Sequence, residues 1–184
     1  LSKIEQQQIK NRYDSKNIEI HPNCINLNEA KKYNKTINNK TNNPLIIGYL
    51  GRIVNTKGMD YLLKACEKLK KSNIPFILKL AGKEDSNTNY IESFKKILGN
   101  QFIYAGVVSG YQKDFFFKSL DLFILPTFFE GLPMSLLECM SYGVVPITTN
   151  VGSINEVVED KVNGIFIKVK DSDSIFEKIT YILN

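Results

Sequence analysis

Short apolar runs alternate with segments of helical period along most of the chain after Pro44. This alternation is typical of βαβ units, in which each strand of a parallel sheet is followed by a helix that packs back onto the sheet. We expect strands at residues 45–50, 76–81, 102–104, 122–125, 145–148 and 164–169. The pattern therefore predicts an α/β fold with a doubly wound, Rossmann-like parallel sheet of about six strands.

The segments between the strands carry apolar residues three or four positions apart. In the first of them, Leu62, Cys66 and Leu69 recur at this spacing while lysines and glutamates occupy the other faces, so Cys66 is expected in the core. Later helices are expected at residues 89–98, 110–119, 133–142, 154–158 and 174–183.

The first 43 residues differ from the rest of the chain. Residues 1–16 are polar with weak helical spacing, and residues 18–21 are predicted to form a short strand that ends at Pro22. Residues 28–43 have almost no apolar content, and we interpret them as a polar surface loop.

Composition narrows the classes of protein. The chain has 184 residues, 43% of them apolar, which suits one domain with a packed core. No apolar run approaches the ~18 residues that a membrane span requires, and the start lacks the apolar middle of a signal peptide, so we expect a cytoplasmic location. Three separated cysteines and one histidine support neither a disulfide framework nor a zinc site.

The net charge of +5 is compatible with nucleic acid, an anionic membrane surface or an anionic small substrate. Much of the excess comes from scattered lysines, and no dense arginine patch with interleaved aromatics is present. We therefore expect no nucleic-acid partner.

Ligands of doubly wound sheets bind where loops leave the carboxyl ends of the strands, near the point where the strand order reverses. After the first predicted strand, the loop GRIVNTKGMD contains Arg52 and Lys57 next to a helix start. An arginine fork, a lysine charge and free helix amides suit a diphosphate. The alternative is two solvated cations with Gly58 as a turn residue.

After the fourth predicted strand comes PTFFEGLPMSLLECMSYG. Pro133 is expected in the first helical turn, and Glu138 lies ~7.5 Å further along the helix axis at 1.5 Å per residue. Glu130 and Glu138 would thus bracket a helix N-terminus at a separation that suits a diphosphate. The alternative is that Glu130 complements the helix dipole and Glu138 lies on the surface.

In combination these motifs resemble glycosyltransferase family 4, a group of retaining sugar transferases with the two-domain GT-B fold. The resemblance covers roughly residues 18–170. Its matching residues, in order, are Gly51, Arg52, Lys57, Gly58, Ala81, Gly82, Glu130, Gly131, Pro133, Glu138, Tyr142, Gly143, Val144, Pro146, Ile147, Val151, Gly152, Glu156, Asn163 and Gly164. The stretch HPNCIN at residues 21–26 resembles the crossing from the first domain of such enzymes into the second.

The resemblance implies that residues 18–184 form the donor-binding domain and that residues 1–17 are either a remnant of a preceding acceptor domain or a link from it. Arg52 and Lys57 would hold the diphosphate of a UDP-, GDP- or ADP-linked sugar and neutralise the charge on the leaving group. Glu130 would bind the transferred sugar and act with these cations in catalysis, and Glu138 would bind the ribose. The other donor-binding residues implied are Gly51, Gly82, Lys83, Val108, Gly131, Leu132, Pro133 and Met134.

The resemblance further implies transfer to an acceptor hydroxyl in polysaccharide or glycoconjugate synthesis, with a peripheral membrane association of the full-length protein. No metal or other cofactor is expected, because two cations and a helix terminus already offset the diphosphate. The single DxD match, Asp171 and Asp173, is interpreted as a helix cap. His21 is expected to be structural.

Ser153 and Asn155 depart from the family pattern, as does the sequence AGKEDS after the second strand, so the fine geometry around sugar and base is open. Without an acceptor domain the chain is expected to bind the donor but to transfer sugar poorly. Two alternatives stay open: a GT-B nucleotide-sugar epimerase, and a noncatalytic module that binds a nucleotide or a protein.

Overall fold

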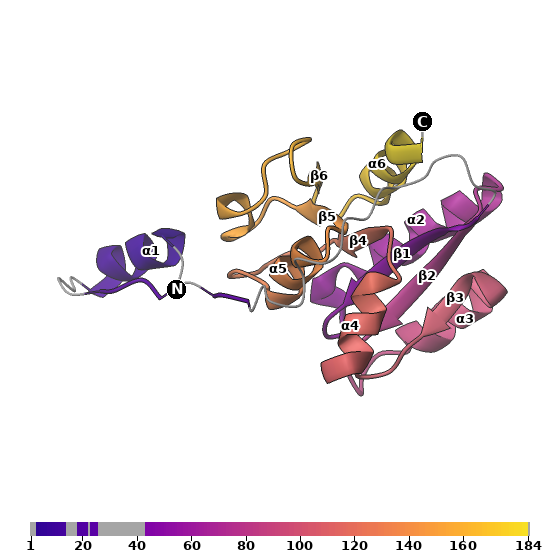
Figure 1. Cartoon of the computed structure of the whole chain (residues 1–184), viewed down its shortest axis with the longest axis horizontal. Coiled ribbons are helices and arrows are strands. Elements are labelled where there is room, and N and C mark those ends of the chain that lie inside the picture. The colour runs from indigo at the N-terminus through magenta and orange to yellow at the C-terminus, as the bar shows by residue number, and fades with distance from the viewer. Residues whose placement is uncertain (1–2, 14–17, 22, 26–42, 184) are drawn as a thin grey trace.

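The computed structural model describes residues 3–13, 18–21, 23–25 and 43–183 and contains one parallel sheet (Figure 1). Its order is β3-β2-β1-β4-β5-β6, and every neighbouring pair is parallel. The strands are β1 (Leu45–Leu50), β2 (Phe76–Ala81), β3 (Phe102–Tyr104), β4 (Leu122–Leu125), β5 (Val145–Thr149) and β6 (Ile165–Ile167). The predicted doubly wound α/β fold is confirmed.

Helices cover both faces of the sheet because the chain winds outward from β1 in two directions. The helices are α2 (Met59–Lys71), α3 (Tyr90–Leu98), α4 (Gly110–Lys118), α5 (Met134–Ser141) and α6 (Ser172–Leu183), with 3-10 turns η2 (Asn55–Lys57), η3 (Gly99–Gln101) and η4 (Ile154–Glu156). Helix α2 packs against α3 and α6, whereas α5 packs against β4 and β5. Within the described parts of the chain, no helix is long and apolar enough to cross a membrane.

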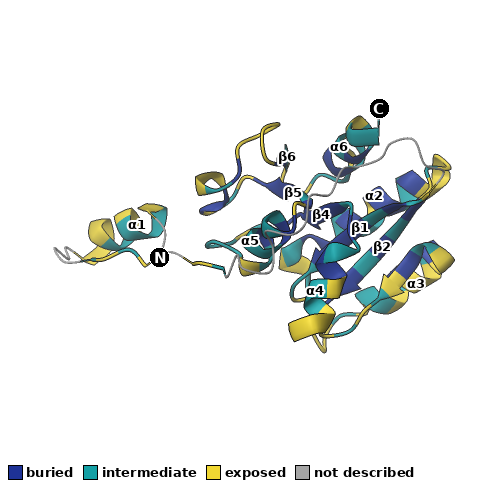
Figure 2. Ribbon diagram, in the orientation of Figure 1, coloured by how far each residue is buried: buried dark blue, intermediate teal, exposed yellow. Residues whose placement is uncertain are grey.

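The strands form the centre of the core (Figure 2). All four residues of β4 are buried, which explains why this strand appears in the sequence as a continuous apolar run rather than an alternating one. Cys66 is fully buried in α2, as its helical spacing predicted. Burial of these side chains on both faces fixes the register of β1 and β4, and therefore the place where their following loops emerge.

The strand order reverses between β1 and β4, and two glycines bring loops together at this edge. Gly82, at φ +129°, is so close to the loop after β1 that a Cβ there would lie 1.8 Å from the carbonyl oxygen of Gly51. Gly58, at φ +77°, would place a Cβ 2.0 Å from the carbonyl oxygen of Pro126. These contacts leave no room for a side chain and hold the three loops together.

The N-terminal part differs from the sequence expectation. The strand expected at residues 18–21 is wrong: this segment has no regular structure, and the Ile18 carbonyl accepts a hydrogen bond from the Gln6 side chain at 2.6 Å. An isolated extended run needs a neighbouring strand to pair with, and none of the described strands supplies one. The polar segment at residues 28–43 lies outside the described residues except for Asn43.

The polar first segment forms a helix, α1 (Lys3–Tyr13), with no buried residues. The backbone amides of Lys3 and Ile4 donate to the carboxylate of Glu156 at 3.4 and 3.3 Å. This contact satisfies amides that a helix leaves without partners at its start. It places α1 beside η4 and the loop before α5.

Several predicted element bounds shift by one or two residues. Helix α5 begins at Met134, with Pro133 as the extended residue before it rather than within the first turn. The helix expected at residues 154–158 is the 3-10 turn η4, and β6 is shorter than residues 164–169. Such ends depend on local hydrogen bonds that hydrophobic periodicity does not specify.

Gly58→Ala should destabilise the protein far more than Gly106→Ala. Both glycines have positive φ, +77° and +73°, but a Cβ on Gly106 would meet nothing within 4 Å. We expect a loss of about 1–2 kcal/mol for Gly106→Ala from backbone strain alone and about 3–5 kcal/mol for Gly58→Ala, where the clash adds to it. Urea unfolding measures both, and equal losses would contradict the close contact with Pro126.

Candidate functional site

A cavity of about 470 Å³ opens at the carboxyl ends of β1 and β4, where the strand order reverses. This is the position at which doubly wound sheets bind their ligands. Residues from four loops and two helices form its wall. They are Tyr49, Leu50, Gly51, Arg52, Lys57, Gly82, Val107, Val108, Lys113, Leu125, Glu130, Pro133, Met134, Ser135 and Glu138.

The first wall is the loop after β1. Its backbone runs beside the loop after β2, since the Gly51 amide donates to the Ala81 carbonyl at 3.0 Å and the Ile53 amide to the Lys83 carbonyl at 2.9 Å. The Tyr49 hydroxyl donates to the carbonyl of Arg52 at 2.6 Å. The backbone of Arg52 is thus fixed, while its side chain is exposed at the cavity.

Burial raises the pKa of the Tyr49 phenol, the negative charge of Glu130 raises it further, and the positive charge of Arg52 opposes both. The phenol therefore keeps its proton at neutral pH and remains a hydrogen-bond donor beneath the cavity. Sequence reasoning had missed Tyr49, because an apolar strand offers no signal that one of its residues will lie under a site.

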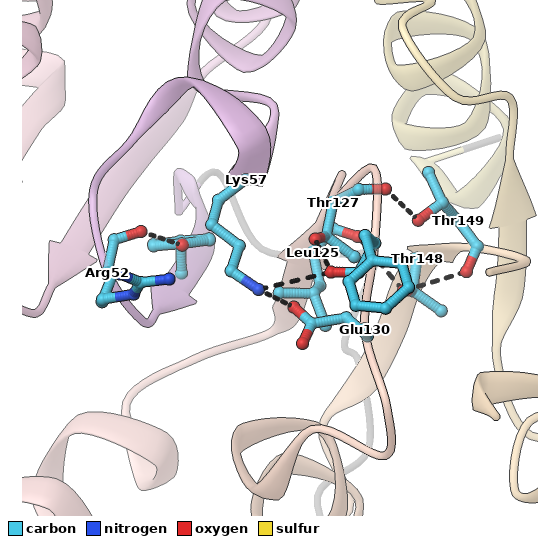
Figure 3. Close-up of polar contacts among 9 residues, drawn as sticks. Arg52, Lys57, Leu125, Thr127, Glu130, Thr148 and Thr149 are labelled. Carbon is cyan, nitrogen blue, oxygen red and sulfur yellow. Dashed lines mark hydrogen bonds and ion pairs between the residues drawn. The ribbon is translucent and has the colours of Figure 1, made fainter. Parts of the chain in front are cut away.

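The second wall is the loop after β4, which three buried threonines hold in place (Figure 3). The Thr148 hydroxyl donates to the Leu125 carbonyl at 3.1 Å, the Thr149 hydroxyl to the Thr127 carbonyl at 2.6 Å, and the Thr127 hydroxyl to the Phe129 carbonyl at 3.1 Å. Side-chain hydrogen bonds thereby satisfy carbonyls at the end of β4 and in the irregular, partly buried loop that follows it. These hydrogen bonds fix the backbone of the loop that leads to Glu130.

The two loops are joined directly. The Phe128 amide donates to the Thr56 carbonyl at 2.9 Å, and Lys57 Nζ lies 2.5 Å from Glu130 Oε1. Figure 3 shows the Lys57 side chain reaching across to Glu130, with Arg52 on the other side of Lys57 in this view. Only 18% and 14% of the two side chains are exposed, so water screens this ion pair far less than a surface pair.

A second ion pair lies further along the cavity. Lys113 Nζ on α4 is 2.5 Å from Glu138 Oε1 on α5, with 33% and 19% of the side chains exposed. Lys113 was missed in the sequence, where it is one lysine among many. Its place in the first turns of the helix after β3 was the available signal, because such turns face the strand ends.

The sequence-predicted site residues divide into two groups. Arg52, Lys57, Glu130 and Glu138 line the one cavity together with Gly51, Gly82, Val108, Pro133 and Met134. Lys83, Gly131 and Leu132 lie outside its lining. Lys83 is exposed and contributes a backbone contact to Ile53, and the Leu132 carbonyl accepts from the Asn23 side chain at 2.7 Å.

The loop before α5 is also bordered by the N-terminal segment. A Cβ on Gly131 would lie 3.0 Å from Glu5 Oε1 of α1, and Gly152, at φ +57°, would place a Cβ 1.8 Å from the carbonyl oxygen of Glu130. The Ser153 amide donates to the Gly131 carbonyl at 3.1 Å. Gly131 is therefore packed between α1 and the loop after β5.

Two further sequence interpretations concern residues away from the cavity. Asp171 Oδ1 accepts hydrogen bonds from the amides of Asp173 and Ser174, both at 2.9 Å, so the DxD match is the cap of α6. His21 is exposed near Glu19. Among the described residues, no group of three or more histidines, cysteines, aspartates or glutamates is placed to hold a metal ion.

Comparison with known proteins agrees with this fold and gives the family. The model of the family "Glycosyl transferases group 1" matches residues 30–184. An uncharacterized glycosyltransferase of Methanocaldococcus jannaschii is 30% identical over 156 residues, which are 82% of this chain and 39% of the relative. The chain therefore belongs to the group 1 glycosyltransferases.

Other relatives include the glycogen synthase of Thermodesulfovibrio yellowstonii, 29% identical over 150 residues that cover 78% of this chain and 29% of that enzyme. The chain thus spans less than half the length of these curated relatives.

Solved structures share the fold. S. aureus TarM, crystallised with UDP, superposes with a TM-score of 0.81 at 19% identity over all of this chain and 36% of TarM. The C-terminal domain of the glycosyl transferase LpcC from Francisella tularensis gives 0.67 at 24% identity, covering 77% of both chains. The sheet is therefore that of the C-terminal domain of GT-B glycosyltransferases.

The Lys57–Glu130 pair should stabilise the fold measurably. In a double-mutant cycle of Lys57→Met and Glu130→Gln, we expect a coupling of about 1–3 kcal/mol in the free energy of unfolding, because each half-buried partner is left without its counterion. Chemical unfolding of the four proteins gives the coupling.

The pair Lys71–Glu67 on α2 is the matched control, since its atoms are 2.8 Å apart but its side chains are 73% and 40% exposed. Its cycle, with Lys71→Met and Glu67→Gln, should give a much smaller coupling. A coupling of equal size in the two cycles would mean that Lys57 and Glu130 are not paired away from water.

Proposed function

We propose that this chain is the donor-binding part of a retaining glycosyltransferase of the family 4 type and that its ligand is a nucleotide-diphosphate sugar. The diphosphate would lie between Arg52 and the start of α5. The observation that carries the proposal is that one cavity brings together three cations, two carboxylates and a helix N-terminus at the switch point of the sheet. TarM, which shares this fold, has been crystallised with UDP.

The charges suit the parts of such a ligand. The Arg52 guanidinium can donate two parallel hydrogen bonds to phosphate, and Lys57 has three N–H donors, so it can keep Glu130 while it contacts a phosphate oxygen. Backbone amides at the start of α5, near Pro133 and Met134, add a partial positive charge. Together they would stabilise the negative charge that grows on the departing diphosphate.

The carboxylates suit the hydroxyl-bearing parts. Glu130, next to the diphosphate position, would accept hydrogen bonds from the hydroxyls of the transferred sugar. Glu138, about one helical turn into α5, would accept them from the ribose, with Gly82 and Val108 beside the base. Each of these contacts pairs an ionised acceptor with a hydroxyl donor, which is the stronger kind of hydrogen bond.

Transfer with retention would follow from this arrangement. The bond between the anomeric carbon and the diphosphate oxygen breaks, the acceptor oxygen bonds to the same face of that carbon, and the acceptor proton goes to the departing phosphate. No side chain is required as general base on this route, and the protein contributes cations and orientation. We propose that the reaction needs no metal, and that an acceptor-binding domain completes the cleft.

The same proposal extends to the residues outside the cavity lining and to the cellular role. Lys83 and the backbone of Gly131 and Leu132 would contact the donor only if their loops move on binding. The acceptor would be a glycan or lipid-linked glycan of polysaccharide or glycoconjugate synthesis, reached in the cytoplasm or at the inner face of its membrane.

Arg52→Ala should weaken donor binding. We expect one of UDP-, GDP- or ADP-glucose to raise the melting temperature of the chain, and the affinity to fall at least about tenfold in Arg52→Ala, because a charged hydrogen bond contributes about 1.5–3 kcal/mol. Thermal shift identifies the ligand and calorimetry measures its affinity.

Arg12→Ala is the control, since Arg12 is exposed on α1. It should bind the donor as the unchanged chain does. Binding that survives Arg52→Ala undiminished would refute the diphosphate position, and formation of an epimer of the bound sugar without any acceptor would indicate an epimerase instead.

A further inference from the structure

Lys113 is the charged member of the cavity wall to which the resemblance assigns no role. It is the one residue through which α4 contributes a charge to the cavity. The other charged residues of this helix have different contacts, since Asp114 accepts from the Tyr142 hydroxyl at 2.6 Å and Lys118 lies over the Tyr142 ring. The orientation of Lys113 toward the ligand site is therefore particular to this residue.

The ammonium of Lys113 holds one oxygen of the Glu138 carboxylate. Lys113 Nζ donates to Glu138 Oε1 at 2.5 Å, and only 19% of the Glu138 side chain is exposed. A carboxylate has two oxygens, each with lone pairs, so one held oxygen leaves the other with a fixed direction for a second donor. The ion pair thus restricts the rotation of the Glu138 side chain before a ligand binds. Less conformational entropy is therefore lost on binding.

The position of Glu138 decides which part of a ligand meets this carboxylate. It lies on α5, further from the Lys57–Glu130 pair than the helix start, and it shares the cavity with Val107 and Val108 of the loop after β3. A nucleotide with its diphosphate at Arg52 would have its ribose in the part of the cavity that Glu138 lines. Vicinal hydroxyls need an acceptor whose lone pairs point at both, and a carboxylate in one orientation provides it.

We propose that Lys113 is a positioning residue that holds Glu138 for the ribose hydroxyls and thereby makes the cavity select ribonucleotides over 2′-deoxyribonucleotides. This inference rests on the proposed function, because it takes the cavity to bind a nucleotide diphosphate. Lys113 acts through Glu138: without its ammonium the carboxylate loses both its orientation and its counterion, and the extra hydrogen bond to the 2′-hydroxyl is lost.

The experiment compares ribo- and 2′-deoxyribonucleotides on the chain and its variants. Calorimetry with UDP and 2′-deoxy-UDP, and with the corresponding guanine and adenine pairs, gives a ratio of affinities for each protein. We expect the unchanged chain to favour the ribose form of its nucleotide by about tenfold, the effect of one charged hydrogen bond. Lys113→Met should reduce this ratio to about twofold or less, as should Glu138→Gln.

Two variants separate positioning from a general effect of charge or folding. Lys113→Arg, which can form the same ion pair, should restore most of the ratio. Lys118→Met removes a neighbouring cation of α4 outside the cavity and should leave both affinities and their ratio unchanged. Should Lys113→Met fail to fold, Lys113→Gln replaces it with a neutral polar side chain, and the expected loss of the ratio is the same.

The outcomes distinguish this inference from the proposed function. A folded Lys113→Met or Lys113→Gln that keeps the tenfold ratio overturns the role of Lys113, as does an unchanged chain that binds a nucleotide diphosphate without preferring ribose. An unchanged chain that binds none of the six nucleotides refutes the proposed function, and this inference with it.

Discussion

The ion pair between Lys57 and Glu130 joins the two loops on which the rest of the site depends. The loops leave adjacent parallel strands, β1 and β4, whose following helices cover opposite faces of the sheet, so the loops diverge and a cavity opens between them. A 2.5 Å contact between half-buried charges fixes the width of this opening. Arg52 precedes the contact in one loop and the start of α5 follows it in the other, so the ion pair lies between the two groups proposed to hold the diphosphate.

The charges of the cavity wall suit an anion although two of the three cations are paired. Lys57 and Lys113 are each offset by a carboxylate, and Arg52 adds a positive charge in an exposed position. Because each of these lysines is paired with a carboxylate, no partly buried charge is left without a counterion, which would be unfavourable. An entering diphosphate would meet Arg52 first and then share Lys57, so that no buried charge needs to lose its partner during binding.

The sequence predicted the sheet well, because parallel strands buried on both faces appear as apolar runs, and β1, β2, β3 and β4 have the expected bounds. It also placed Arg52, Lys57, Glu130 and Glu138 at one edge, since each follows a strand that ends there. The roles assigned to these residues remain proposals. The strand expected at residues 18–21 failed because pairing depends on a neighbour, which local pattern does not reveal. Lys113 was missed because a lysine in a basic chain becomes distinctive only through its partner.

The central claim is that this cavity holds a nucleotide-diphosphate sugar in one orientation. A crystal structure of the chain with its bound donor nucleotide tests it most directly. The account predicts both phosphates between the Arg52 guanidinium, Lys57 and the amides at the start of α5, with the ribose at Glu138. Phosphates bound elsewhere, or a ribose at Glu130 with the diphosphate turned away from Arg52, would contradict it.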